Sequence, residues 1–381
     1  MNEHKRTVVL TPGPVHLYPS VIKAVEPAHH RTSGFRELVK GLEHSLKQLL
    51  RTVNPVYMIT SSGTGAMEAA IANVTSPGTR VLVIEGGKFG KRWEELGRVY
   101  LCDVETMSFP PGSPFGIDAI LEIIERVNPE VIALNHVESS TGALFPLGEF
   151  CSRLPEERPV LVVDAIASLG VEELEMDSWG IDLVVSAGQK ALGAPPGISF
   201  ISMSERAREI SQKCSRPLYY FSAPRYHESC MEGDTPFTPA IQTFQILKYS
   251  LDSQKMAGWE KMKQRHRRSS LAVTSAFQAL GMSRLAQRPS SSVQAMKTPA
   301  GCDSSELIEK LSDRYGVVIA GGQGELKGKI IRTGYTGLYS GDTLTLAVRA
   351  VGELLVSDGF DADIERALAS MKPLKSQKDI F

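Results

Sequence analysis

The chain has 381 residues, which is enough for two to three domains at roughly 150 residues each. Its composition is that of an ordinary globular protein, with 42% hydrophobic and 22% charged residues. The 42 Lys and Arg residues nearly balance the 43 Asp and Glu residues, so the net charge of −1 gives no general reason to bind nucleic acid or an anionic membrane. No apolar run approaches the ~20 residues of a transmembrane helix. We predict neither a nucleic-acid nor a membrane partner.

The cysteines and the chain ends bear on the compartment. The five cysteines are odd in number and scattered, and no CxxC motif occurs, so a disulfide scaffold and a zinc ribbon are both disfavoured. Only a short apolar stretch follows the N-terminus, which argues against a secretory signal. The last three residues, Asp379-Ile380-Phe381, are not a peroxisomal tripeptide. We predict a cytoplasmic enzyme without a metal site.

The pattern along the chain predicts an N-terminal arm over residues 1–20, with no clear regular element, and a large domain over residues 21–240. In the large domain, short apolar runs alternate with amphipathic stretches, which favours a mostly parallel sheet covered by helices. The predicted strands are residues 56–60, 81–85, 131–135, 160–164, 181–186 and 198–203. The predicted helices between them are residues 65–74, 89–97, 117–127 and 147–154.

The second half of the chain departs from this alternation. Residues 205–240 contain four prolines and the aromatic cluster Tyr219-Tyr220-Phe221. A helical pattern over residues 241–280, interrupted near Gly258, is predicted to link the large domain to a smaller α/β domain over residues 281–381. The small domain is expected to hold strands at residues 291–296, 317–319 and 329–333, helices at 304–315 and 342–355, and a polar, frayed tail from residue 372.

Polar residues follow three of the strands, at the edge where parallel sheets bind ligands. Residues 61–65, Ser-Ser-Gly-Thr-Gly, form a small turn that opens a helix and could hold a phosphate; a plain helix N-cap is the alternative. Asp164 ends an apolar strand, where a buried carboxylate needs a partner such as a pyridinium or a metal ion. An aspartate that caps the next turn is the alternative there.

Lys190 follows the next strand, among the small residues of segment 186–197. Desolvation lowers the pKa of a lysine, as a Schiff-base lysine requires, although most lysines are solvated surface charges. A phosphate cradle, a strand-end Asp and a strand-end Lys are together the parts of a pyridoxal 5′-phosphate (PLP) site. In such a site Lys190 bonds to the cofactor and Asp164 keeps the pyridine nitrogen protonated.

These segments resemble the class V, fold-type-I PLP aminotransferases, in the alanine–glyoxylate and serine–pyruvate group. The resemblance extends from Thr11 to Gly334 and implies a large domain with a mostly parallel, seven-stranded sheet and a smaller C-terminal α/β domain. It is carried by the segments SSGTGAMEAA (61–70), GGKFGKRW (86–93), HVESSTG (136–142), VDAIASLG (163–170), SAGQKALGAPPG (186–197) and GGQGELKGKIIRTG (321–334).

The resemblance implies a role for each matching residue. Lys190 would be the catalytic residue, which bonds the cofactor and moves a proton between Cα of the substrate and C4′ of the cofactor. Asp164 would pair with the pyridinium nitrogen, and Ser139 would hydrogen-bond near O3′. Phe89 occupies the position of a ring that stacks on the pyridine, where some relatives have Trp. The phosphate would be held by Ser62, Gly63, Thr64 and Gln189.

Two further matches concern a second subunit and the substrate. Thr238 matches a residue that reaches the phosphate of the neighbouring subunit's cofactor, which implies a homodimer with shared active sites. Some relatives also have a Tyr three residues earlier, where this chain has Thr235. Arg332 matches the arginine that binds the substrate α-carboxylate through two parallel hydrogen bonds; an exposed strand-end arginine is the alternative.

Three other features are interpreted as structural. His136 and Glu138 lie beside the site, and His136 is interpreted as strand-end structure rather than as a base. The basic stretch at residues 261–268 would be spread around a helix as a solvated face. The cysteines could suggest a desulfurase, but none lies in a Ser/Gly-rich catalytic loop.

We predict a PLP-dependent aminotransferase that moves an amino group from a small amino acid, alanine or serine, to a small 2-oxo acid, glyoxylate or pyruvate, by a ping-pong mechanism. The choice of these substrates rests on the resemblance. One alternative is another PLP reaction on the same fold: aminophosphonate transamination, desulfuration or β-elimination. The other is a non-catalytic accessory subunit, against which the intact Lys190, Asp164 and Arg332 argue.

Overall fold

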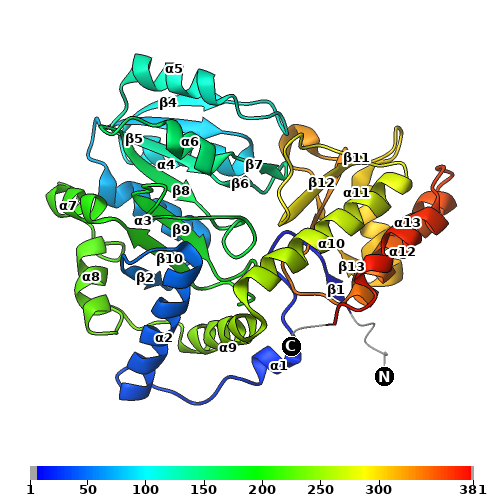
Figure 1. The fold of residues 1–381 in the computed structure, drawn as a ribbon, viewed down its shortest axis with the longest axis horizontal. Coiled ribbons are helices and arrows are strands. Elements are labelled where there is room, and N and C mark those ends of the chain that lie inside the picture. The colour runs from blue at the N-terminus through cyan, green and yellow to red at the C-terminus, as the bar shows by residue number, and fades with distance from the viewer. Residues whose placement is uncertain (1–6, 379–381) are drawn as a thin grey trace.

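A seven-stranded sheet forms the centre of the larger part of the molecule (Figure 1). The computed structural model describes residues 7–378, so the first residues of the predicted arm and the C-terminal tripeptide lie outside the described residues. The strands are β2 (Val56–Ile59), β3 (Arg80–Glu85), β4 (Asp103–Ser108), β5 (Val131–Asn135), β8 (Val160–Asp164), β9 (Leu183–Ala187) and β10 (Ser199–Met203). Their order is β2-β10-β9-β8-β5-β3-β4, and only β10 runs antiparallel to its neighbours.

The predicted seven-stranded, mostly parallel sheet is therefore confirmed. The apolar pattern indicates six of its strands and misses β4. This strand lies at the edge of the sheet and has no buried residue, with Asp103 and Glu105 both exposed. Edge strands carry charged side chains that discourage pairing with another chain, and such strands lack the continuous apolar run by which buried strands are recognised.

Helices cover both faces of this sheet. The helices on one face are α2 (Ser33–Leu50), α5 (Ile117–Val127), α6 (Leu147–Arg153) and α9 (Ile241–Ala257), and those on the other are α3 (Gly63–Val74), α4 (Lys88–Val99), α7 (Glu205–Lys213) and α8 (Ala223–Met231). Successive residues of β2 show the division, because Val56 and Met58 belong to the first core and Tyr57 and Ile59 to the second. Burial on both faces explains why the strands read as apolar runs.

The helical pattern at residues 241–280 forms two helices, α9 and α10 (Trp259–Ala279). They meet at Gly258, whose φ of 93° is a conformation that residues with a side chain rarely adopt. In Figure 1, α10 runs between the two parts of the molecule, and its residues Ala276 and Phe277 are buried in the core of the smaller part. No helix within residues 7–378 is long and apolar enough to cross a membrane.

The smaller part has its own four-stranded sheet. Its strands are β11 (Ser283–Arg284), β12 (Val293–Lys297), β14 (Ala320–Gly321) and β15 (Ile330–Gly334), in the order β11-β12-β15-β14. Its helices are α11 (Ser304–Lys310), which continues as a π-helix over Leu311–Tyr315, α12 (Gly341–Ser357) and α13 (Ile364–Ser370). Short elements complete the chain: α1 (Pro19–Ile22), the hairpin of β6 (Val137–Glu138) and β7 (Ala143–Leu144), and 3₁₀ turns at Gly324–Leu326 and Lys372–Leu374.

Two expectations for the ends of the chain are wrong. The N-terminal arm contains β1 (Val8–Val9), which pairs in parallel with β13 (Val317–Val318). The tail is anchored as far as it is described, because Leu374 is buried and the buried Gln377 donates to Ser269 Oγ at 3.0 Å and to the carbonyl of Tyr339 at 2.9 Å. In sequence, a polar tail looks the same as a frayed end. The burial of Gln377 becomes visible only in the packed structure.

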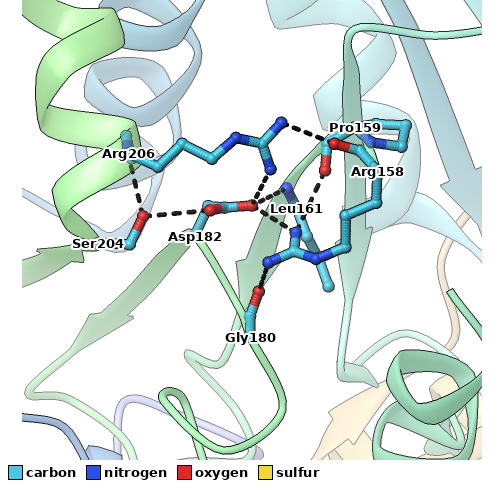
Figure 2. A network of polar contacts seen from close by, with 8 residues as sticks. Arg158, Pro159, Leu161, Gly180, Asp182, Ser204 and Arg206 are labelled. Atoms are coloured by element: carbon cyan, nitrogen blue, oxygen red, sulfur yellow. Dashed lines mark hydrogen bonds and ion pairs between the residues drawn. The ribbon is translucent and has the colours of Figure 1, made fainter. Parts of the chain in front are cut away.

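A network of polar contacts around Asp182 ties three strands together at the edge of the sheet where β8 and β9 begin (Figure 2). The buried carboxylate accepts hydrogen bonds from Arg158 Nη1 at 2.6 Å, from the backbone N–H of Leu161 at 3.0 Å and from Ser204 Oγ at 3.1 Å. Arg206 Nη1 lies 3.4 Å away. One side chain therefore joins residues that flank β8, β9 and β10.

We expect Asp182→Asn to lower the free energy of unfolding by about 3 kcal/mol, because it leaves the guanidinium of Arg158 enclosed without its anion. The measurement is the midpoint of urea unfolding followed by circular dichroism. The matched control is Asp118→Asn, which breaks an exposed pair with Arg153 and should change stability by less than about 1 kcal/mol. Equal shifts for the two variants would show that the Asp182 network adds no stability.

Candidate active site

A cavity of about 240 Å³ lies where β2, β5, β8 and β9 end, and it is called here the cofactor cavity. Its walls bring together eight of the residues that the sequence singled out. These are Ser62, Gly63, Thr64, Phe89, Ser139, Asp164, Gln189 and Lys190. They come from segments that are far apart in the chain, and the carboxyl ends of parallel strands place them at one edge of the sheet.

The first turn of α3 forms one end of the cofactor cavity. Ser62 occupies the N-cap position, but its side chain does not cap the helix, so its hydroxyl remains available to a ligand. The N–H groups of Gly63 and Thr64 belong to the first turn, where no intrahelical acceptor exists. A Cβ at Gly63 would lie 2.5 Å from Cδ1 of Ile166, so a larger residue there would require the Ile166 side chain to move. This arrangement suits an anion better than it suits a plain helix cap.

Asp164 lies buried in the cavity wall at the end of β8. Its Oδ2 accepts a hydrogen bond from Asn135 Nδ2 at 2.7 Å, and its Oδ1 accepts one from the N–H of Ile166 at 2.7 Å. Through the second contact, Asp164 also caps the turn that follows it, with its Oδ1 atom. Burial raises the pKa of Asp164 to about 7, although the hydrogen bond from Ile166 opposes the rise. A cationic group in the cavity would favour the ionised form.

Lys190 lies in the turn after β9 and lines the cofactor cavity. Its Nζ donates a hydrogen bond to the carbonyl of Pro12 at 2.5 Å. Burial lowers the pKa of Lys190 to about 8, Asp164 opposes the change, and Arg332 adds to it. At neutral to mildly basic pH a larger share of this amine is therefore unprotonated and nucleophilic than in an ordinary lysine.

The N-terminal arm contributes to the site in a way that the sequence patterns do not predict. Gly13 and Pro14 line the cofactor cavity. Gly13 has a φ of 129°, and a Cβ there would lie 2.5 Å from Cδ of Lys190. The segment Thr11-Pro12-Gly13-Pro14 marks the start of the resemblance, but no local signal connects it with a lysine 178 positions away.

The N-terminus of α4 places Phe89 at the cavity wall. Buried Glu138 holds this helix end, because its carboxylate accepts the N–H of Gly90 at 2.8 Å and the N–H of Phe89 at 3.3 Å. Arg92, one turn further on, donates to Thr64 Oγ1 at 2.8 Å and lies 5.1 Å from the centroid of the Phe89 ring. Glu138 and Arg92 both lie in segments that carry the family resemblance, and this membership is the sequence signal by which they could have been found.

Arg332 comes from β15 of the smaller part and is buried, so the exposed-arginine interpretation is wrong. Its Nη1 donates to the carbonyl of Ser139 at 2.9 Å, and its Nε donates to the carbonyl of Gly321 at 2.8 Å. Arg332 does not itself line the cofactor cavity, but it is held against Ser139, which does. Burial lowers the pKa of Arg332, while the charge of Glu138 raises it.

Two predicted residues lie away from the cofactor cavity. Thr238 is exposed in the loop between α8 and α9 and does not line the cavity of its own chain. His136 is buried beside β5, and burial lowers its pKa to about 3, so it is neutral. It does not line the cavity either, which agrees with a structural role. In residues 7–378 no cluster of three or more His, Cys, Asp or Glu residues could hold a metal ion.

The cofactor cavity fits PLP in four respects. Lys190 offers an amine of lowered pKa for the aldehyde, Asp164 offers a buried carboxylate for the pyridinium, and the first turn of α3 suits the phosphate. In addition, Asn135 Oδ1 and Gln189 Oε1 are buried in the cavity wall and have no hydrogen-bond partner within residues 7–378. Buried polar atoms without a partner in the protein are expected to contact a ligand or water.

Comparison with known families identifies the chain. The model of the family described as "Aminotransferase class-V" matches residues 15–327. The chain belongs to the class V aminotransferases. It is therefore a PLP-dependent transaminase with the fold-type-I architecture.

Individual relatives of this class V aminotransferase carry different names. A "Soluble hydrogenase, small subunit" of Synechococcus sp. (strain PCC 6716) is 32% identical over 93% of this chain and 94% of its own length. An alanine–glyoxylate aminotransferase of Callithrix jacchus is 30% identical over 91% of this chain and 87% of its own. The crystal structure of an alanine–glyoxylate aminotransferase from Nostoc sp. superposes with a TM-score of 0.86, at 30% identity over 92% of this chain and 95% of that one.

Proposed function

We propose that this class V aminotransferase transfers the amino group of a small amino acid, alanine or serine, to a small 2-oxo acid, glyoxylate or pyruvate, in a ping-pong reaction. One observation carries the proposal: buried Arg332 is held beside the cavity that Lys190 and Asp164 line. An arginine in such a place suits an α-carboxylate. The names of the relatives from Callithrix jacchus and Nostoc sp. support glyoxylate as the acceptor.

Each residue has a defined task in the proposed mechanism. When bound, PLP supplies an electron-withdrawing ring that accepts the electron pair of the Cα–H bond. Arg332 binds the substrate carboxylate and so orients Cα toward Lys190. The Lys190 amine removes the proton from Cα and delivers it to C4′ of the cofactor. Asp164 holds the ring nitrogen in its protonated form, and Phe89 packs against the ring.

The composition of the cofactor cavity argues against sulfur chemistry. None of the five cysteines lines it, so no thiol is placed to receive sulfur. The cytoplasmic location stays a prediction.

The test of the substrate proposal is the visible absorption spectrum of the PLP-loaded protein after addition of one amino acid without an oxo acid. Alanine or serine is expected to bleach the yellow band, and glyoxylate or pyruvate to restore it. Arg332→Gln should raise the alanine concentration needed for half-bleaching by about 10–100-fold, because a charge-assisted pair is lost. A band that no amino acid changes would overturn the transamination proposal in favour of another PLP reaction.

We propose further that the enzyme is a homodimer in which Thr238 of each chain contacts the cofactor phosphate of the other. The exposure of Thr238, and its absence from the cavity of its own chain, support this. The test mixes the inactive Lys190→Ala variant with the weakened Thr238→Ala variant under conditions of subunit exchange. If Thr238 acts across the interface, each mixed dimer regains one complete site and activity rises. If it acts within its own chain, mixing restores nothing.

A further inference from the structure

A second cavity, of about 430 Å³, lies between the two parts of the molecule and shares no lining residue with the cofactor cavity. Its walls come from the turn at residues 171–173, from one side of α10 and from the chain around β11 and β12. The volume lies within the range of small-molecule sites. The transamination proposed above makes no use of this second cavity.

The second cavity explains part of the basic stretch on α10. Lys263 and Arg267 lie one turn apart on that helix and both line the cavity, whereas Arg268 does not. Arg265 faces another direction, because it donates to the carbonyls of Leu338 and Tyr339. The charges of this stretch are therefore spread around the helix as predicted, but the side with Lys263 and Arg267 lines a cavity and not only a plain surface.

Two guanidinium groups in the second cavity lack a directly bonded anion. Arg267 and Arg284 make no hydrogen bond and no ion pair within 4.0 Å to any residue of the described chain, 7–378. Nε of Arg284 is also buried without an acceptor. Arg267 is exposed, so the penalty for a charged N–H that has lost its water and gained no acceptor concerns Arg284, and an oxyanion in the cavity would remove it.

Two of the three carboxylates of the second cavity are already bonded by the protein. Glu173 pairs with Lys263 at 2.7 Å and with Arg51 at 3.1 Å. Glu172 accepts the N–H of Ser291 at 2.5 Å. Burial raises the pKa of Glu172, while that hydrogen bond and the charges of Arg267 and Lys263 oppose the rise. Glu260 is exposed on the first turn of α10. Within residues 7–378, Arg267 and Arg284 are the cations of this cavity that bond directly to no carboxylate.

We propose that the second cavity is a binding site for a small oxyanion, carboxylate or phosphate, held by Arg267 and Arg284. Guanidinium groups bind both kinds of anion through paired, charge-assisted hydrogen bonds. Arg284 comes from β11 and Arg267 from α10, while the turn at residues 171–173 closes the cavity from the larger part. A bound anion would therefore join α10 to the small sheet.

The experiment uses the PLP-loaded enzyme, so that the phosphate cradle of the cofactor cavity is already filled. Its thermal midpoint is measured against inorganic phosphate, citrate and succinate at constant ionic strength, which separates specific binding from screening. We expect a saturable rise with phosphate or with the carboxylates, and the anion that acts identifies the class of ligand. Arg267→Gln and Arg284→Gln should each weaken the apparent affinity at least about tenfold.

Arg268→Gln is the matched control, because it removes an exposed arginine from the same helix without altering the second cavity, and it should leave the affinity unchanged. Arg267 is exposed as well, so Arg267→Gln is expected to fold. It therefore tests the proposal even if Arg284→Gln does not fold. The proposal is overturned if no anion gives a saturable shift, or if the shift persists in the Arg267 variant. Transaminase activity without added anion should be the same in the Arg267 and Arg268 variants.

Discussion

Lys190→Ala is expected to lower kcat for transamination by about 10²–10⁴-fold or more, because it removes the only amine that lines the cofactor cavity in the described chain and with it the proposed acid–base group. The variant should also lose its covalent link to PLP. Mass spectrometry after borohydride reduction checks this, since reduction fixes a lysine-bound cofactor to the chain. We expect the mass of the wild-type chain to increase by one cofactor and that of the variant to stay unchanged.

The lowered pKa of Lys190 adds a prediction about pH for the same residue. The unprotonated amine is the nucleophile, so the rate at which the apoprotein takes up PLP should rise with pH, with a midpoint near the pKa of about 8. Lys261→Ala, which removes an exposed lysine of α10, should leave both the uptake and kcat as they are. An alanine variant of Lys190 that still traps one cofactor upon reduction would assign the covalent role to another lysine.

Asp164→Asn is expected to lower kcat by about 10²–10³-fold while the fold is retained. The amide has nearly the shape of the carboxylate and can still accept the N–H of Ile166, but it cannot hold a proton on the pyridine nitrogen through its charge. The measurement is the rate of the single half-reaction with alanine in a stopped-flow spectrometer, together with the dissociation constant of PLP.

The control for this substitution is Asp313→Asn, which makes the same chemical change at an exposed position of the π-helix. Its kcat should equal that of the wild type. A variant of Asp164 with the wild-type rate would mean that the buried carboxylate serves the turn at Ile166 and the amide of Asn135 rather than the cofactor.

Much of the fold could be predicted because it depends on local sequence patterns. Strands buried on both faces appear as apolar runs, and the residues that follow them are the ones that reach the ligand edge of a parallel sheet. Asp164 and Lys190 could be singled out for this reason, from their positions at the ends of apolar runs. The edge strand β4 could not be found in this way, since each of its residues is half-buried or exposed and none is buried.

The sequence by itself determined the family, the cofactor and the residues that follow β2, β8 and β9, because each of these depends on the residue types in one short segment. The tertiary structure alone decided which distant residues meet. It set the carbonyl of Pro12 against Lys190, Glu138 against the first turn of α4, and Arg267 and Arg284 around one cavity. Such contacts join segments whose own patterns are independent of each other, so they arise only when the two parts of the chain pack together.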